Sequence, residues 1–159
     1  MNVIDKARAL ALAAPIVLLG GALGSQYIGG LYPCEMCHWQ RWPHMAAIAL
    51  ALLAILLRRT AATTLLTTLA AVAILISGAI GIFHAGVEYG WWEGLTSCST
   101  GLQGGSAEDI LNSIMATPLT RCDQAQWTLM GISLAGFNAI FSIGTALAIF
   151  GYMAKAKKA

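Results

Sequence analysis

Charged residues are scarce in this sequence: Asp, Glu, Lys and Arg make up only 10% of its 159 residues, whereas hydrophobic residues make up 58%. A soluble domain normally carries about 25% charged residues, so this chain has too few to cover a surface that faces water. Its net charge of +2 is too small to indicate binding to nucleic acid. These shortages exclude an ordinary soluble domain, and the class they indicate is an integral membrane protein.

Four apolar stretches contain no charged residue, and they cover residues 9–33, 42–57, 60–83 and 124–154. A bilayer core of about 30 Å is crossed by roughly 20 residues of helix. The second stretch is the shortest, so its helix is expected to begin before Trp42. We predict an all-α integral membrane fold, a four-transmembrane-helix bundle in one domain over residues 1–159, with helices at about 9–30, 39–57, 61–84 and 126–153.

The basic residues indicate the orientation of this bundle, because positive charges collect on the cytoplasmic side of a membrane. Seven of the nine fall on one side: Lys6, Arg8, Arg58, Arg59, Lys155, Lys157 and Lys158. Six of the seven acidic residues fall on the other side, as do all five tryptophans, which favour the headgroup layer. We therefore expect both termini in the cytoplasm and two outward loops, at about 31–38 and 85–125.

The N-terminus has two interpretations, because Lys6 and Arg8 precede an apolar run, as basic residues do in a signal peptide. The run is longer than the roughly 7–15 residues of a signal core, which favours a retained helix. The expected topology of the remaining chain is the same in either case.

All four cysteines fall on the outward side, where Cys34 and Cys37 form a C-x-x-C and Cys98 and Cys122 flank a long part of the second loop. Disulfides persist in oxidising compartments, so an even number on one face indicates two pairs. A bridge that closes so short a loop removes little chain entropy, so a C-x-x-C is more often redox-active than structural. The second pair could equally be a structural brace. Because each pair is local, we predict resting disulfides Cys34–Cys37 and Cys98–Cys122.

Cys37 is expected at the start of the second helix, where unpaired backbone N–H groups favour a thiolate. Arg41 follows one helical turn later on the same face, where its charge would favour the thiolate further and its N–H groups could hold a polar ligand. The alternative for Arg41 is an interfacial anchor. Only one other basic residue, Arg121, shares the outward side. This isolation favours a function for Arg41.

Two histidines are further candidates for ligand binding. His84 is expected at the outer end of the third helix, at the depth of Cys37, and His44 lies one turn beyond Arg41. A histidine inside a membrane span is a functional candidate. For His44, a hydrogen-bonded core residue is an equally good interpretation.

Two metal centres have to be weighed against a thiol site. The residues Cys34 to His38 match the C-x-x-C-H of covalent c-type haem attachment, but haem would leave Cys98 and Cys122 unexplained. A four-thiolate zinc site needs its second pair at close spacing, and 23 residues separate Cys98 from Cys122. We expect no metal.

The second outward loop is long for a connection without structure of its own, which indicates a working segment. The residues from Ser106 to Asp109 have the pattern of a capping box, so we predict a short helix there. We expect this helix to lie in the membrane interface, because its apolar residues share one side: Ile110, Leu111, Ile114 and Met115.

The run from Cys34 to Arg41, Cys-Glu-Met-Cys-His-Trp-Gln-Arg, resembles the C-x-x-C-x-x-x-R signature of the DsbB family of bacterial disulfide bond formation proteins. The resemblance covers essentially the whole chain: four spans, cytoplasmic termini, two outer cysteine pairs, and Cys122 shortly before the last helix. The C-x-x-C alone would not be specific, whereas the combination is.

The resemblance implies a redox relay in the bacterial inner membrane, with its active face in the periplasm. A reduced DsbA-type thioredoxin-fold oxidase would attack the Cys98–Cys122 disulfide and form a mixed disulfide with Cys98. Electrons would then pass to Cys34–Cys37. Cys37 would face the ring of a membrane quinone, either ubiquinone or menaquinone.

The resemblance further implies that Arg41 contacts the quinone, since it occupies the family's quinone-binding arginine position, and that His84 lies near a second contact. Two other functions stay open. A reductase similar to vitamin K epoxide reductase also pairs a C-x-x-C with a quinone in a helical bundle. A non-enzymatic membrane scaffold would use its disulfides only to brace its loops.

Overall fold

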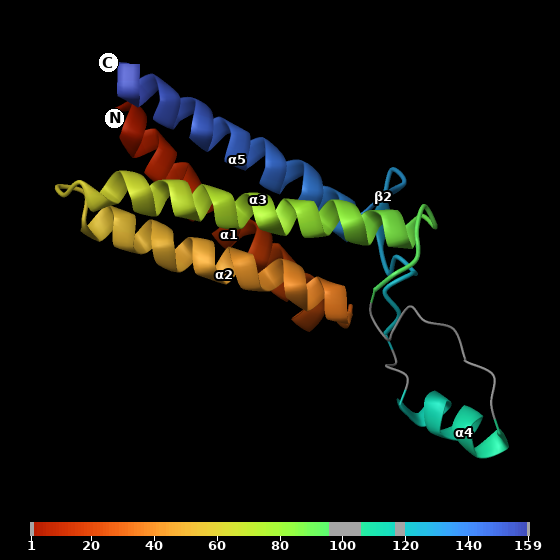
Figure 1. The fold of residues 1–159 in the computed structure, drawn as a ribbon. Coiled ribbons are helices and arrows are strands. Elements are labelled where there is room, and N and C mark those ends of the chain that lie inside the picture. The colour runs from red at the N-terminus through yellow and green to blue at the C-terminus, as the bar shows by residue number, and fades with distance from the viewer. Residues whose placement is uncertain (1, 96–105, 117–119, 159) are drawn as a thin grey trace.

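Four long helices lie side by side in the computed structural model, which describes residues 2–95, 106–116 and 120–158 (Figure 1). They are α1 (Val3–Tyr27), α2 (Glu35–Leu56), α3 (Ala62–Glu88) and α5 (Leu134–Lys158). The segment between α3 and α5 contains a short helix, α4 (Ala107–Ala116), and a hairpin of two strands, β1 (Thr128–Leu129) and β2 (Ile132–Ser133). The expected helical fold is confirmed.

The short helix α4 begins where the capping box predicts it. Leu111 and Met115, two of the four apolar residues expected on one side of it, are exposed. Side chains exposed in this way are available to a membrane interface, and that location for α4 stays a prediction.

Both chain ends lie at the same end of the bundle, together with the turn between α2 and α3 (Figure 1). Arg8, a nearly buried side chain of α1, connects these segments. Its guanidinium donates to the Asp5 carboxylate at 2.9 Å and to the backbone carbonyl of Arg58 at 3.4 Å. Cys34 is at the opposite end of α2, so it lies away from this end of the bundle.

Three helices of the described chain are long and apolar enough to cross a membrane, namely α1, α3 and α5. The helix α2 is not one of them, which agrees with its uncharged stretch being the shortest. It nevertheless has 22 residues and packs against α3 along the bundle. The polar residues in its first turns lower its hydropathy, and these residues build the site.

The start of α2 differs from the prediction, which placed it at residue 39. The helix begins at Glu35, because the Cys34 sulfur accepts a hydrogen bond from the Cys37 backbone N–H and so caps it. Pro43 consequently lies inside the helix and not in its first turn. A proline inside a helix removes one backbone hydrogen bond. With a helix start at residue 39, Pro43 would have been in the first turn, where that bond is absent in any case.

The start of α5 also differs, since residues 128–133 form a hairpin where the prediction had helix. Met130 and Gly131 both have positive φ angles, 53° and 79°, as a tight two-residue hairpin turn requires. Tyr89, just after α3, holds this hairpin: its hydroxyl donates to the Gly131 carbonyl at 3.0 Å and accepts from the Ser133 N–H at 2.9 Å. The hairpin therefore anchors the outer loop to the end of α3.

Small residues fill the contacts between the helices. The largest buried cluster consists mostly of alanines from all four long helices, with Ile74 and Ile149. Where α3 meets α5, Gly78 and Gly81 bring the two backbones close: a Cβ on Gly78 would lie 2.8 Å from the Ile143 side chain and 3.2 Å from its backbone nitrogen. Close approach at small residues is how membrane helices gain packing energy.

A methyl group at Gly78 is expected to destabilise the bundle. Gly78→Ala should lower the free energy of unfolding by about 1–3 kcal/mol, the usual range for overpacking. Gly144→Ala, on α5, is the matched control, because nothing lies within 4 Å of its added Cβ. Unfolding of both variants in detergent, followed by helical circular dichroism, measures the difference. Equal stability of the two variants would show that the α3–α5 contact is looser than described.

Candidate functional site

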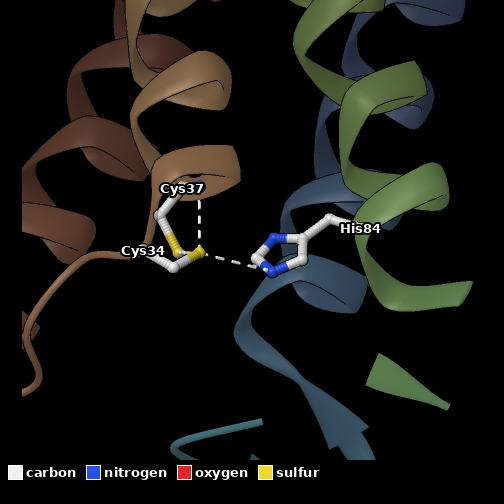
Figure 2. A group of neighbouring side chains, drawn as sticks. All are labelled: Cys34, Cys37 and His84. Atoms are coloured by element: carbon white, nitrogen blue, oxygen red, sulfur yellow. Dashed lines mark hydrogen bonds between the residues drawn. The ribbon is translucent and has the colours of Figure 1, made fainter. Parts of the chain in front are cut away.

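Cys34, Cys37 and His84 meet at the end of the bundle, where α2 begins and α3 approaches its last turn (Figure 2). The two sulfur atoms lie 2.8 Å apart, and the Cys34 sulfur lies 3.5 Å from His84 Nε2. Both cysteines are free thiols. The expected Cys34–Cys37 disulfide is therefore not formed in this structure, which shows the pair in its reduced state. A bond would require the sulfurs to approach to about 2.05 Å.

Cys122 joins this site from the segment before β1. It is fully buried and packs in one cluster with Cys34, Met36 and Val87. Its backbone is hydrogen-bonded to the His84 ring, and its sulfur is in a disulfide. The expected partner, Cys98, lies outside the described residues. The structure thus places one cysteine of the second pair against the first pair, a proximity that sequence separation could not predict.

The Cys34 thiol has a pKa well above its ordinary value. Its hydrogen bond with Cys37 is the largest cause, followed by burial, which disfavours a charged sulfur. The nearby Glu88 carboxylate acts in the same direction. At neutral pH, Cys34 is therefore held as a thiol while its neighbour is ionised first.

His84 is 2% exposed and has partners on both ring nitrogens. Gln40 Nε2 lies 2.8 Å from Nδ1, and Glu88, one turn further along α3, has a carboxylate oxygen 3.7 Å from Nε2. Ser133 donates to the other oxygen of this carboxylate. Sequence reasoning did not find Gln40 or Glu88. The signal for Glu88 was its spacing of four residues from His84, which puts both on one helix face.

Arg41 reaches from α2 to α1, where its guanidinium donates to Gln26 Oε1 at 2.5 Å and to the Ala22 carbonyl at 3.2 Å. It lines a cavity of about 280 Å³ whose walls come from all four long helices and both outer loops. The candidates Cys37, His44 and His84 line the same cavity. Its other walls are largely apolar, and they include Leu18, Phe137 and Phe141. A cavity of this composition suits an apolar ligand with a few polar atoms.

His44 lies deeper in the bundle and is 3% exposed. Its Nε2 is 2.9 Å from Asn138 Oδ1, 3.0 Å from Ser77 Oγ and 3.5 Å from Ser142 Oγ. Asn138 Nδ2 in turn donates to Gln40 Oε1 at 2.8 Å. A polar network therefore runs from Cys34 through His84, Gln40 and Asn138 to His44. Asn138 and Ser77 were missed, although polar residues within apolar helices are the signal for such a network.

Arg121, the second basic residue on the cysteine side, is engaged locally. Its guanidinium forms two hydrogen bonds with the Asp123 carboxylate: Nε donates to Oδ1 at 2.8 Å, and Nη2 donates to Oδ2 at 2.5 Å. This pairing lowers the pKa of Asp123 below its ordinary value. Arg121 is exposed and paired with Asp123, whereas Arg41 has no acidic partner in the described chain. Arg41 is therefore the better candidate to bind a ligand in the cavity.

Comparison with known proteins gives a family for nearly the whole chain. The family model described as "Disulfide bond formation protein DsbB" matches residues 5–151. The chain is 33% identical to "Disulfide bond formation protein B" of Verminephrobacter eiseniae, in an alignment that covers 86% of this chain and 81% of that protein. It is 29% identical to "Uncharacterized protein RP370" of Rickettsia prowazekii, covering 80% and 75% of the two chains. No solved structure matches it.

In the dithiol state, iodoacetamide at neutral pH is expected to modify Cys37 at least about tenfold faster than Cys34, because only a thiolate reacts and the pKa of Cys34 is raised. Timed quenching and peptide mass spectrometry give the two rates. Replacing Cys37 by Ser removes the largest cause of the raised pKa, so Cys34 should then react faster than it does in the unchanged chain. Preferential modification of Cys34 in the unchanged chain would contradict this assignment.

Proposed function

Because the chain belongs to the DsbB family, whose members are disulfide-bond-forming membrane proteins, we propose that it reoxidises a periplasmic DsbA-type dithiol oxidase and passes the electrons to a membrane quinone. One observation carries the proposal: the reduced C-x-x-C opens with Arg41 on an apolar cavity, while Cys122 packs against its other side. In this proposal, electrons enter the site through the pair that contains Cys122 and leave it from the C-x-x-C to a ligand in the cavity.

The proposed topology has four spans, with both termini in the cytoplasm and the site at the periplasmic surface. The two termini lie at the same end of the bundle, opposite the start of α2, which supports an even number of crossings (Figure 1). Seven of the nine basic residues lie toward the end with the termini, and positive residues favour the cytoplasmic side. α2 would be the fourth span, its polar residues covered by the other helices.

Electron entry is proposed to run through the second cysteine pair. The partner's dithiol reduces Cys98–Cys122, and a thiolate of this pair then attacks Cys34 in an oxidised Cys34–Cys37 bridge. The new S–S bond forms at Cys34, and the electron pair of the old bond leaves on Cys37. The second loop thiolate then attacks the mixed disulfide, restores Cys98–Cys122 and releases Cys34 as a thiolate. The packing of Cys122 against Cys34 supports this direct exchange.

The residues around the cavity fit a quinone. Its apolar walls suit a ring and tail that arrive from lipid, and a size of about 280 Å³ is close to the lower limit of roughly 300 Å³ for ligand pockets. Arg41 would bind a ring oxygen with the N–H groups that Gln26 and Ala22 leave free. When bound, a quinone supplies the acceptor for the two electrons and two protons that the Cys34–Cys37 dithiol loses on forming its disulfide.

A docking place for the soluble partner is proposed beside Cys122. A second hollow, of about 680 Å³, is lined mostly by polar residues from the end of α1 and from both outer loops, including Gln26, Tyr32, Arg121 and Gln126. Gln126 donates to the Tyr32 backbone carbonyl at 2.5 Å, which connects the two segments at this hollow. A partner bound there would bring its thiols next to the second cysteine pair.

Replacing Arg41 by Met should raise the apparent KM for quinone about tenfold or more, because a charge-assisted hydrogen bond to the ring oxygen is lost. Arg41→Lys should restore only part of the affinity, since lysine lacks the planar fork. Exchange with a DsbA-type partner should be unchanged. Arg59→Met, at the far end of the bundle, is the control. Quinone kinetics unchanged by Arg41→Met would show that this residue is only an anchor.

The two cysteine pairs should separate by role. Cys98→Ser is expected to abolish oxidation of the partner, while Cys34 and Cys37 remain able to be reoxidised by quinone after chemical reduction. Cys37→Ser should allow one exchange between the partner and the second pair, with no turnover. Partner oxidation and quinone absorbance, measured separately, distinguish these outcomes. Trapping of the partner on Cys34, with Cys98 dispensable, would reverse the proposed direction.

A further inference from the structure

Gln40 and Asn138 take no part in the relay proposed above, yet both contribute to the buried network beneath the cysteines. Gln40 is 7% exposed, and its amide touches α2, α3 and α5 at once. A buried amide with partners on three helices requires an explanation beyond packing. Its NH₂ group needs acceptors and its oxygen needs donors, so the partners fix its orientation.

The partners of Gln40 determine which end of its amide points to His84. The NH₂ group donates to the Met36 carbonyl at 3.2 Å, and Oε1 accepts from Asn138 Nδ2 at 2.8 Å. Asn138 is oriented in the same way, because its Nδ2 also donates to the Ser77 carbonyl at 3.2 Å. Carbonyl oxygens only accept, so neither amide can be reversed without setting two acceptors or two donors against each other. The Gln40 NH₂ group therefore faces His84.

This polarity decides the proton position on the His84 ring. Gln40 Nε2 approaches Nδ1 at 2.8 Å as a donor, so Nδ1 must be the unprotonated nitrogen that accepts. The proton of a neutral ring is then on Nε2. Nε2 faces the Cys34 sulfur at 3.5 Å and the Glu88 carboxylate at 3.7 Å, and the ring also bonds to the Cys122 backbone. All of these groups can accept a hydrogen bond.

We propose that Gln40, oriented by Asn138, is a positioning residue that holds His84 as a fixed hydrogen-bond donor toward the Cys34 sulfur. The proposal deepens the proposed function, on which it rests for the role of Cys34. Whenever a disulfide bond to Cys34 breaks with Cys34 leaving, the bonding electron pair stays on its sulfur as negative charge. The Nε2–H of His84 and the backbone N–H of Cys37 then stabilise that charge from two directions.

The same assignment separates His84 from two other roles. A general base would need a lone pair on the nitrogen that faces the thiol, and here that nitrogen carries the proton. A metal ion would need the same lone pair. The ligand atoms of Cys34, Cys37 and His84 lie within 4.8 Å of one another, a spacing that a metal could bridge. The Gln40 NH₂ group opposes that use, because a metal-bound ring normally donates from its other nitrogen.

The test uses chains with Cys37→Ser, in which alkylation of Cys34 by iodoacetamide is followed against pH by peptide mass spectrometry, with the second pair left oxidised. Gln40→Glu keeps the shape of the side chain, but an ionised carboxylate only accepts. The His84 proton should then move to Nδ1, and the midpoint of Cys34 alkylation should rise by about one pH unit, as expected for loss of a charge-assisted hydrogen bond. Gln40→Leu, which offers neither donor nor acceptor, should give a smaller rise.

Other charged groups around Cys34 remain the same in all these chains, namely Arg41 on α2, Glu88 on α3 and Arg121 near Cys122. Ser142→Ala is the matched control: it removes a partner of Asn138 Oδ1 and should leave the midpoint unchanged. Nitrogen-15 NMR of histidine-labelled protein reads the tautomer directly, with the proton expected on Nε2 in the unchanged chain and on Nδ1 in Gln40→Glu.

A proton on Nδ1 of His84 in the unchanged chain would overturn the proposal. So would an alkylation midpoint in Gln40→Leu equal to that of the parent, which is the result expected if Gln40 only fills space. Neither measurement uses quinone or a soluble partner. These measurements can therefore contradict the positioning role of Gln40 without contradicting the proposed relay, and the reverse is also true.

Discussion

The hydrogen bond from the Cys37 backbone N–H to the Cys34 sulfur determines how the rest of the site is arranged. It starts α2 at Glu35 and so sets which residues of this helix share a face. Gln40 and Arg41 follow Cys37 by three and four residues, and His44 follows them by four and three. All four line one cavity. A helix that started at residue 39 would leave Cys37 outside the regular turn. The cap thus makes Cys34 the residue from which the geometry of the site follows.

Two kinds of contact hold the bundle. Toward the end with the termini, alanines from all four long helices let these helices approach closely, so packing alone connects them. Toward the cysteine end, Gln40, His44 and Asn138 connect three helices through hydrogen bonds. Such polar groups are costly to bury without partners, so each one specifies where its neighbour must be. The part of the bundle whose side-chain positions are most strictly determined therefore lies next to the cysteines.

Sequence reasoning found the helices and the cysteines because both leave local signals: long uncharged runs and a C-x-x-C. It placed the starts of α2 and α5 wrongly, because the sulfur cap lies before the uncharged run of α2, whereas the hairpin turn at Met130 lies within the uncharged run of α5. Glu88, Gln40 and Asn138 were missed for another reason. Their importance arises from contacts between helices far apart in the chain, and periodicity within one helix carries no information about those partners. The reverse held for Arg41, whose isolation among acidic residues was visible in the sequence.

The composition of α2 has a consequence for the biogenesis of the protein. This helix is less apolar than its neighbours, and three of its polar side chains find their partners on other helices: Arg41 on α1, Gln40 and His44 on α3 and α5. An isolated α2 would carry these groups unpaired into lipid, where each is costly. As the proposed fourth span, α2 would thus partition into the bilayer only together with the helices that receive it. Insertion and assembly of this segment would then be a single cooperative event, and the cell's translocation machinery would have to retain α2 until α3 and α5 emerge.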